Sequence, residues 1–241
     1  MRLRRILVPA VMTGRELARR GLALGLLTAL PLAFYGASAG HSDHAVVTGG
    51  IAMAFSIAGA SIFVAMTARP VDQRLVLAGY RPWELLLGRL LLLELFGVLV
   101  AGVFSVVMVF GTGPDHPWLT AAGVGLVAFT SVPFGLAVGA LAPHELEGVL
   151  VLIGVVGVQL TLDSSATIAR LLPFWGPQRL MDHSIDPTAV IGAAIPVNLL
   201  YALMLFVIAS YIMHRRAPAF AVPRLRSPFL VRGGGAARPS A

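Results

Sequence analysis

The 241-residue sequence contains no cysteine and no lysine, and charged residues make up only 12% of it. The lack of cysteine excludes a disulfide framework and a thiolate metal site. The lack of lysine excludes a Walker A loop, because that phosphate-binding motif requires a Gly-Lys pair. A soluble domain has roughly 25% charged residues, about twice the fraction found here. The chain is therefore not an ordinary soluble domain.

Hydrophobic residues make up 57% of the sequence and gather in long uncharged runs. A helix needs roughly 20 apolar residues to cross a bilayer, and in lipid its backbone polar groups are all paired internally. We therefore expect an all-α polytopic membrane protein with six transmembrane helices, of which the fifth is short for a full crossing. The runs cover residues 21–42, 44–68, 95–114, 116–144, 148–162 and 187–214.

The 18 basic residues are all arginines, and their distribution along the chain is uneven. Residues 1–20 hold six, residues 69–89 hold four and residues 215–241 hold six. Placing these three segments on one side gives the positive-inside pattern, which predicts a plasma (inner) membrane protein with both termini cytoplasmic. The same distribution favours membrane lipid over nucleic acid as the partner of the basic residues.

The chain divides into three predicted regions. Residues 1–20 are expected to form an amphipathic cytoplasmic surface helix, residues 21–216 the transmembrane domain, and residues 217–241 a disordered cytoplasmic tail rich in Pro, Gly and Arg. A cleaved signal peptide is an alternative for the N-terminal region, since residues 37–39 (Ala-Ser-Ala) match a cleavage site. We prefer the surface helix, because cleavage would leave an odd number of spans.

Residues 69–89 are the strongly charged segment between two apolar runs. Pro70 suits the first turn of a helix, and Gly79 with Pro82 predicts the end of that helix. We expect a short amphipathic helix on the cytoplasmic surface between spans 2 and 3, with Leu75 on its apolar side. A lipid-facing basic connector is the simpler alternative.

Three features in or between the predicted spans predict a particular role less specifically. Glu94 lies about 12 Å inside the third span, so it is either a polar site in a translocation path or subunit seam, or a carboxylate that reaches the interface or an arginine. Gly135 and Gly139 permit close helix packing, although this spacing is common by chance in a glycine-rich chain. Residues 163–187, with Pro, Gly and aromatics, favour an interfacial or re-entrant segment on the outer side.

The other short motifs predict no catalytic, metal or cofactor site on this chain. The G-x-S-x-G string at residues 36–40 ends a span instead of forming a strand-to-helix turn. His144-Glu145 begins an H-E-x-x-H string, but residue 148 is glycine. Polar residues near the predicted outer loops are more simply solvated than metal-binding: His41, Asp43, His44, Asp115 and His116.

The stretch Trp83-Glu84-Leu85-Leu86-Leu87-Gly88-Arg89 resembles the cytoplasmic loop of type-2 ATP-binding cassette (ABC) exporter permeases. In that family a Trp-Glu-Leu-like element and a Leu-Gly-Lys/Arg element lead into the third span. The upstream sequence Asp72-Gln73-Arg74 departs from the acidic-Arg-acidic run that is common there. The basic N-terminal helix, the six spans and the Leu-Pro element before the last span agree with the family over nearly the whole length.

The resemblance implies a non-catalytic permease subunit of an exporter for a drug, antibiotic or lipid-like substrate. ATP would bind a separate ABC ATPase subunit, and the permease would pair with a second copy or a paralogue. The loop between spans 2 and 3 would be a coupling helix seated in the ATPase. The residues expected to contact that partner are Asp72, Gln73, Arg74, Leu75, Gly79, Tyr80, Arg81, Trp83 and Glu84.

Two other functions remain open from the residues themselves. A six-span intramembrane enzyme would need a nucleophile and a base within the membrane, but the histidines lie in or beside loops. A secondary transporter would show internal repeats and buried ion ligands, and neither is clear in the sequence. Either protein would act without an ATPase.

Overall fold

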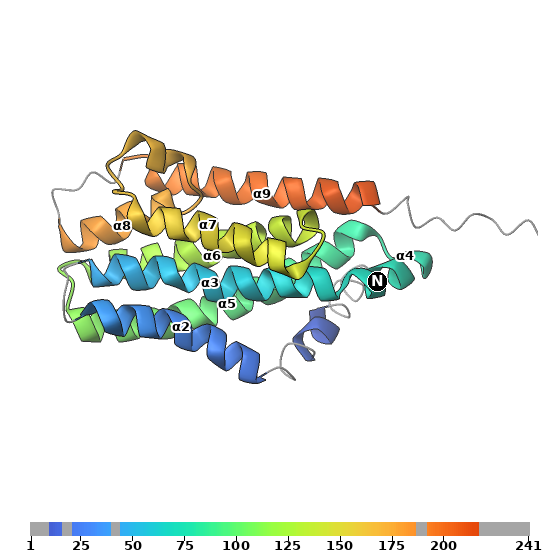
Figure 1. Ribbon diagram of the computed structural model, residues 1–241, viewed down its shortest axis with the longest axis horizontal. Coiled ribbons are helices and arrows are strands. Elements are labelled where there is room, and N and C mark those ends of the chain that lie inside the picture. Colours follow the sequence, from blue (N-terminus) through green and yellow to red (C-terminus); the bar gives the residue numbers. More distant parts are fainter. Residues whose placement is uncertain (1–9, 16–20, 40–43, 187–191, 217–241) are drawn as a thin grey trace, which may run out of the picture.

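The computed structural model describes residues 10–15, 21–39, 44–186 and 192–216, and over these ranges it is helical and contains no strand. The all-α prediction is therefore confirmed. Long helices run side by side along the long axis of the molecule (Figure 1), and shorter helices lie near its two ends. The long helices are α2 (Gly21–Ala39), α3 (Ala45–Thr67), α5 (Pro82–Thr112), α6 (Pro117–Leu141), α7 (Glu145–Thr161) and α9 (Ala194–Arg216). The shorter ones are α4 (Arg69–Leu77), the 3₁₀ helix η1 (Thr167–Leu171) and α8 (Trp175–Ile185).

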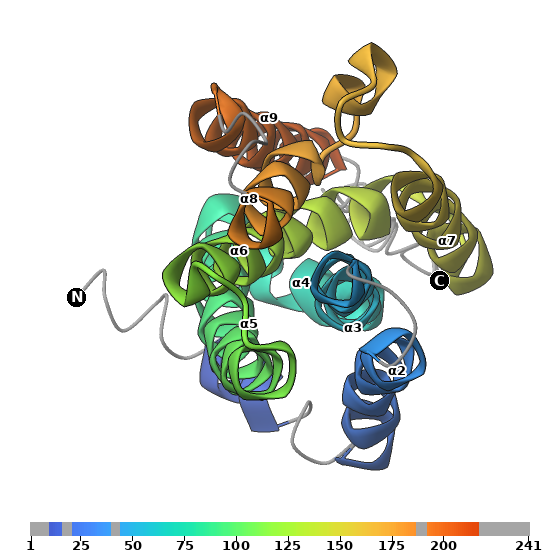
Figure 2. The ribbon, with the colours of Figure 1, turned by 90° about the vertical axis from the view of Figure 1, so that its left-hand side faces the viewer.

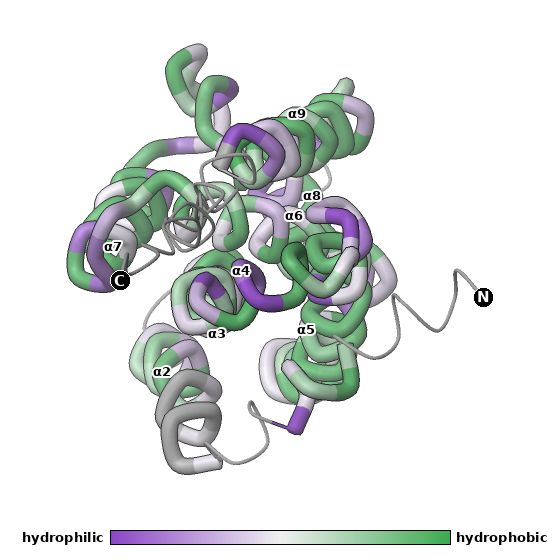
Figure 3. Tube along the Cα trace, turned by 90° about the vertical axis from the view of Figure 1, so that its right-hand side faces the viewer, coloured by the Kyte–Doolittle hydropathy of each residue, from purple (hydrophilic) through white to green (hydrophobic). Residues whose placement is uncertain are grey.

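The two ends of the bundle differ, and we name them the α4 end and the α8 end after the short helix that each carries (Figure 1). Seen from the α4 end in Figure 3, hydrophilic residues of α4 lie at the tip of largely hydrophobic helices. Within the described ranges, four helices are long and apolar enough to cross a membrane: α3, α5, α6 and α9. The protein is thus a multi-pass membrane protein, and the count of six spans stays a prediction.

Helices α3 and α6 form the centre of the bundle, as the view along its axis shows (Figure 2). Their most apolar stretches are each 78% buried, against 28% for α5 and 17% for α9. Helices α5 and α9 therefore direct large apolar surfaces outward, where lipid or another membrane chain can cover them.

The close packing of α3 against α6 depends on Gly135 and Gly139. A Cβ atom added at Gly139 would lie 2.7 Å from the Cβ of Ala65, and one added at Gly135 would meet Ser61 and the backbone carbonyl of Ala58. Because a side chain at either glycine would collide with α3, the small-residue spacing in the sequence does correspond to a helix–helix contact within the chain.

The predicted helix positions are close to the observed ones, with one clear correction at the last span. The sixth span was expected from about Thr188, but α9 begins at Ala194, which puts Pro196 in its first turn, where proline is tolerated. In the predicted N-terminal surface helix, residues 10–15 are helical, and Gly14 lies near Leu92 of α5. Residues 1–9, 16–20 and the predicted tail 217–241 lie outside the described residues, so the predicted region boundaries are untested.

The segment predicted to be interfacial or re-entrant forms η1 and α8 at the α8 end. Helix α8 lies between α6 and α9 in Figure 2, with Met181 fully buried against Gly50 and Gly123. The hydroxyl of Thr120 in α6 donates to that of Ser184 in α8 at 3.0 Å. Helix α8 therefore packs inside the bundle, and the choice between an interfacial and a re-entrant segment stays a prediction.

Candidate functional site

Helix α4 follows α3 almost directly, with Ala68 as the single residue between them. Pro70 occupies the first turn of α4 and Asp72 adds a negative charge there, both favourable at a helix N-terminus. The helix ends before Gly79, whose φ of 90° is readily adopted by glycine. Pro82 then begins α5. The short helix and its turn therefore form where the sequence predicts them.

Arg69, the first residue of α4, ties this helix to the C-terminal end of α6. Its guanidinium donates hydrogen bonds to the carbonyl oxygens of Gly139, Ala142 and Pro143. The last carbonyls of a helix have no partner within the helix and carry a partial negative charge, so a guanidinium is well suited to this position.

Asp72 ties the same helix to α5 through a two-pronged ion pair with Arg89. The Nη1 atom of Arg89 donates to one oxygen of Asp72 at 2.7 Å, and its Nη2 atom donates to the other. The side chain of Arg89 is 4% exposed and that of Asp72 is 14% exposed. A buried pair of this kind is stable when both partners are present, and removing one of them leaves an uncompensated charge.

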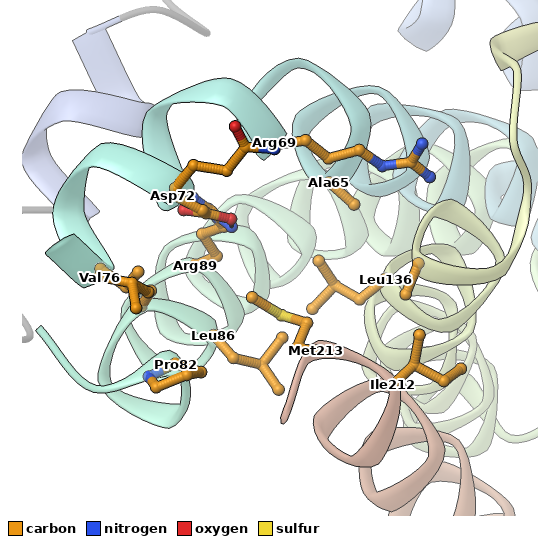
Figure 4. Close-up of a pocket in the computed structure, with 13 residues that line it drawn as sticks. Ala65, Arg69, Asp72, Val76, Pro82, Leu86, Arg89, Leu136, Ile212 and Met213 are labelled. Carbon is orange, nitrogen blue, oxygen red and sulfur yellow. Dashed lines mark hydrogen bonds and ion pairs between the residues drawn. The ribbon is translucent and has the colours of Figure 1, made fainter. Parts of the chain in front are cut away.

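A cavity of about 240 Å³ adjoins this ion pair, and Figure 4 shows Asp72 and Arg89 on its wall. The rest of the wall is mostly apolar and comes from α3, α4, α5, α6 and the end of α9, including Leu86, Leu136 and Met213. The three elements joined by Arg69 and by the ion pair therefore surround a space that side chains do not fill.

The nine residues predicted to contact a partner fall into an outward and an inward group. The exposed group comprises Gln73, Arg74, Gly79, Arg81 and Trp83, whereas Leu75 and Tyr80 are half-buried. Asp72 and Glu84 point inward. Glu84 is 4% exposed, and its Oε2 atom accepts a hydrogen bond of 3.1 Å from the backbone N–H of Arg81, which caps the start of α5.

Glu94, the predicted intramembrane polar site, is half-buried on α5 and does not line this cavity. Within the described part of the chain, it has neither a hydrogen bond nor an ion pair. The structure therefore brings Asp72 together with Arg89, and it does not bring Glu94 to either of them.

A model of the ABC-2 type transporter family matches residues 19–176, well over half of the chain and the whole of the α4–α5 region. The chain belongs to the ABC-2 type transporter family. It is the permease component, a membrane transport subunit that is generally non-catalytic, and such permeases associate with an ABC ATPase subunit, often as dimers. No curated protein matches the chain.

The sequence pattern of this ABC-2 permease does not predict the contact of Arg69 with α6 or that of Arg89 with Asp72. Arg69 was recognised for its charge alone, and Arg89 as part of the family resemblance. One signal was present: residues 69–89 contain four arginines and only two acids, Asp72 and Glu84, so an arginine was available to pair with Asp72. Which one pairs depends on how α4 folds back on α5, and the local pattern does not contain that information.

Proposed function

We propose that this ABC-2 permease exports a drug, antibiotic or lipid-like molecule across the plasma (inner) membrane, using ATP hydrolysed by a separate ABC ATPase subunit. Both termini and α4 face the cytoplasm, six helices span the membrane, and a second permease copy or a paralogue completes the pathway. The family match favours this function over the secondary transporter and the intramembrane enzyme.

The observation that carries the coupling role is the asymmetry of α4. One side is held by Arg69 to α6 and by Asp72 to Arg89 of α5. The other side exposes Arg74, together with the large apolar side chain of Leu77, which is 61% exposed. A partner that binds the exposed side can therefore move α5 and α6 through bonds already in place.

In the mechanism we propose, ATP closes the ATPase pair and displaces α4. The ion pair and the contacts of Arg69 pass this displacement to α5 and α6 as a rigid-body movement. ATP shifts the bundle between states by favouring one of them, because equal affinity for both states would shift nothing.

The test is a variant with Arg74→Ala, Tyr80→Ala and Arg81→Ala, compared with wild type in proteoliposomes that contain the ATPase. We expect export per ATP hydrolysed to fall about tenfold, within the usual range of coupling free energies. Membrane insertion should be unchanged, because none of these side chains is fully buried.

Arg170→Ala is the matched control, because Arg170 is an exposed arginine at the opposite end of the bundle. Its export per ATP should equal that of wild type. Unchanged export in the triple variant would contradict the coupling role and would favour a lipid-facing connector instead.

A further inference from the structure

The coupling proposed above makes no use of the cavity beside α4, whose volume is about 240 Å³. This cavity lies where the apolar helices of the bundle meet the hydrophilic residues of α4 at its tip (Figure 3). In a multi-pass membrane protein, a change from apolar to hydrophilic residues along the bundle is expected where the hydrocarbon core of the bilayer ends. Bilayer lipid is therefore expected around this end of the bundle.

The inner wall of the cavity is apolar and buried. Leu85, Leu86, Leu136 and Ala140 contribute to it, and each of them is at most 9% exposed. In another protein, an apolar cavity of about 150 Å³ stays dry and binds benzene. The cavity beside α4 is larger, so it has room for an alkyl chain of roughly eight to ten carbon atoms.

The charged side chains of the wall have their partners inside the protein. Arg89 pairs with Asp72, and Arg69 donates to carbonyl oxygens at the end of α6. The Nε atom of Arg89 has no hydrogen-bond partner, but it is buried and is therefore not offered to a ligand. Gln73 is exposed and can bond to water. The wall thus offers a ligand mainly apolar contacts, which favours a hydrocarbon over a polar compound.

The half-buried residues of the wall mark where the cavity meets the protein surface. They include Val76 of α4, Pro82 of α5 and Ile212 of α9. Figure 4 shows Val76 and Pro82 across the space from Ile212. Because the outer faces of α5 and α9 are largely uncovered, bilayer hydrocarbon is expected to lie against two of the helices that form the wall.

Positive charge beside the cavity favours a lipid with an anionic headgroup. Arg215, two residues after Met213 of the wall, is exposed, and its guanidinium lies 5.0 Å from the ring centre of Tyr211. An exposed arginine near a membrane surface attracts anionic lipid. The acids Glu145 and Glu147 at the same end belong to α7, which does not line the cavity.

We propose that this cavity binds a segment of an acyl chain of an anionic membrane phospholipid. The chain would lie against Leu86, Leu136 and Met213, and so would contact α5, α6 and α9 at once. The site lies within one chain, so it requires neither the coupling role of α4 nor an ATPase. A free medium-chain amphiphile shares this chemistry, but the uncovered faces of α5 and α9 favour the bilayer as the source.

The experiment uses the full chain in phosphatidylcholine nanodiscs that contain an increasing fraction of phosphatidylglycerol with a photoreactive diazirine in one acyl chain. Mass spectrometry then locates the residues that are labelled on irradiation. Leu86 and Leu136 are each 2% exposed, so lipid reaches them only through the cavity. We expect their labelling to saturate at a low fraction of the photoreactive lipid. Leu95 and Leu99, on the outer face of α5 and 60% and 62% exposed, should be labelled in linear proportion to it.

Ala140→Phe is the variant that fills the cavity, because it adds a ring of the size of benzene to the wall. Loss of room for two or more methylene groups should lower the labelling of Leu86 about tenfold. The labelling of Leu95 should be unchanged. Ala140→Leu fills less of the space and should give a smaller decrease.

Ala121→Phe is the matched control, since Ala121 is exposed on the same helix and does not line the cavity. It should be labelled at Leu86 as wild type is, and a thermal unfolding midpoint verifies that every variant is folded. Arg215→Gln should lower the labelling of Leu86 to the level given by phosphatidylcholine that carries the same diazirine.

Three results would overturn the proposal. The first is absence of labelling at Leu86 and Leu136 in nanodiscs where Leu95 is labelled, and the second is undiminished labelling of Leu86 in Ala140→Phe. The third is labelling of Leu86 by another route alone. Labelling by a photoreactive octanol but not by the phospholipid would identify a free amphiphile as the ligand, and labelling only after removal of residues 217–241 would identify that segment as the occupant.

Discussion

The two ends of this permease differ in the charged groups that they bury. At the α4 end, Asp72 meets Arg89 in a two-pronged ion pair, although the Nε atom of Arg89 lacks a hydrogen-bond partner. At the α8 end, the carboxylates of Asp163 and Asp182 line a cavity in which acids outnumber guanidinium groups, and Gln159 keeps an unpaired oxygen. The comparison shows that an ion pair joins two elements at the α4 end, whereas at the α8 end serine groups donate the hydrogen bonds to Asp163 and Asp182.

The largest expected effect is the loss of one partner of the ion pair. Asp72→Asn or Arg89→Met should lower the free energy of unfolding by about 3–5 kcal/mol, because the remaining group is left buried without its counter-ion. Chemical denaturation in detergent, followed by circular dichroism, measures the loss.

The double variant Asp72→Leu with Arg89→Met is the control for this pair. An apolar pair of similar volume should restore most of the stability, since no charge is then buried. If each single variant costs less than about 1 kcal/mol, the range for an exposed pair, then the two residues do not form the buried link described here.

A smaller loss is expected from Arg69→Met, which removes the hydrogen bonds to the end of α6. The free energy of unfolding should fall by about 1–2 kcal/mol, because the carbonyls of Gly139 and Ala142 lose their donor. Arg74→Met, on the exposed side of α4, should stay within about 0.5 kcal/mol of wild type in the same denaturation experiment. Equal losses in the two variants would show that Arg69 acts through charge alone.

The smallest effect has the opposite sign and occurs at the α8 end. Burial raises the pKa of Asp182 above its ordinary value of 3.8, so the folded protein holds this proton more tightly than the unfolded chain does. Relative to Asp182→Asn, the wild type therefore loses stability as pH rises through the raised pKa. The variant should therefore be more stable by about 0.5 kcal/mol near neutral pH.

The measurement for Asp182 is the thermal unfolding midpoint of both proteins across a pH series. The difference should grow toward neutral pH and vanish at low pH, where Asp182 is protonated in both states. A variant that is less stable than wild type at neutral pH would contradict the uncompensated charge. It would instead show that the folded protein compensates the charge of Asp182, as it does that of Asp72.

The sequence predicted most of the helices because its uncharged runs are long and its charged breaks are sharp. Helix α4 was predicted as well, since Pro70 and Gly79 mark its two ends. The predicted start of the last span was wrong, because apolar composition continues through residues 187–193. Nothing in the sequence marks Ala194 as the first helical residue.

The polar contacts at the two ends were harder to predict because each is assembled from distant segments. Arg69 meets carbonyls some 70 residues further along the chain, and Gln159 meets Gln178 across a 3₁₀ helix. A single charged or amide residue in an apolar sequence indicates that a partner exists, but the partner is chosen by the packing of helices. That is why Asp72 and Glu84 were predicted at the partner surface, although their side chains point inward; whether they also contact an ATPase stays a prediction.

The glycine contact between α3 and α6 limits how this permease can change shape. Sliding either helix along the other would force side chains into main-chain atoms at Gly135 and Gly139, so the pair is expected to keep its register and turn as one spine. Arg69 is attached to the end of that spine. A displacement of α4 would then rotate α3 and α6 together. The peripheral helices, whose outer faces the rest of the described chain leaves largely uncovered, would open and close the pathway.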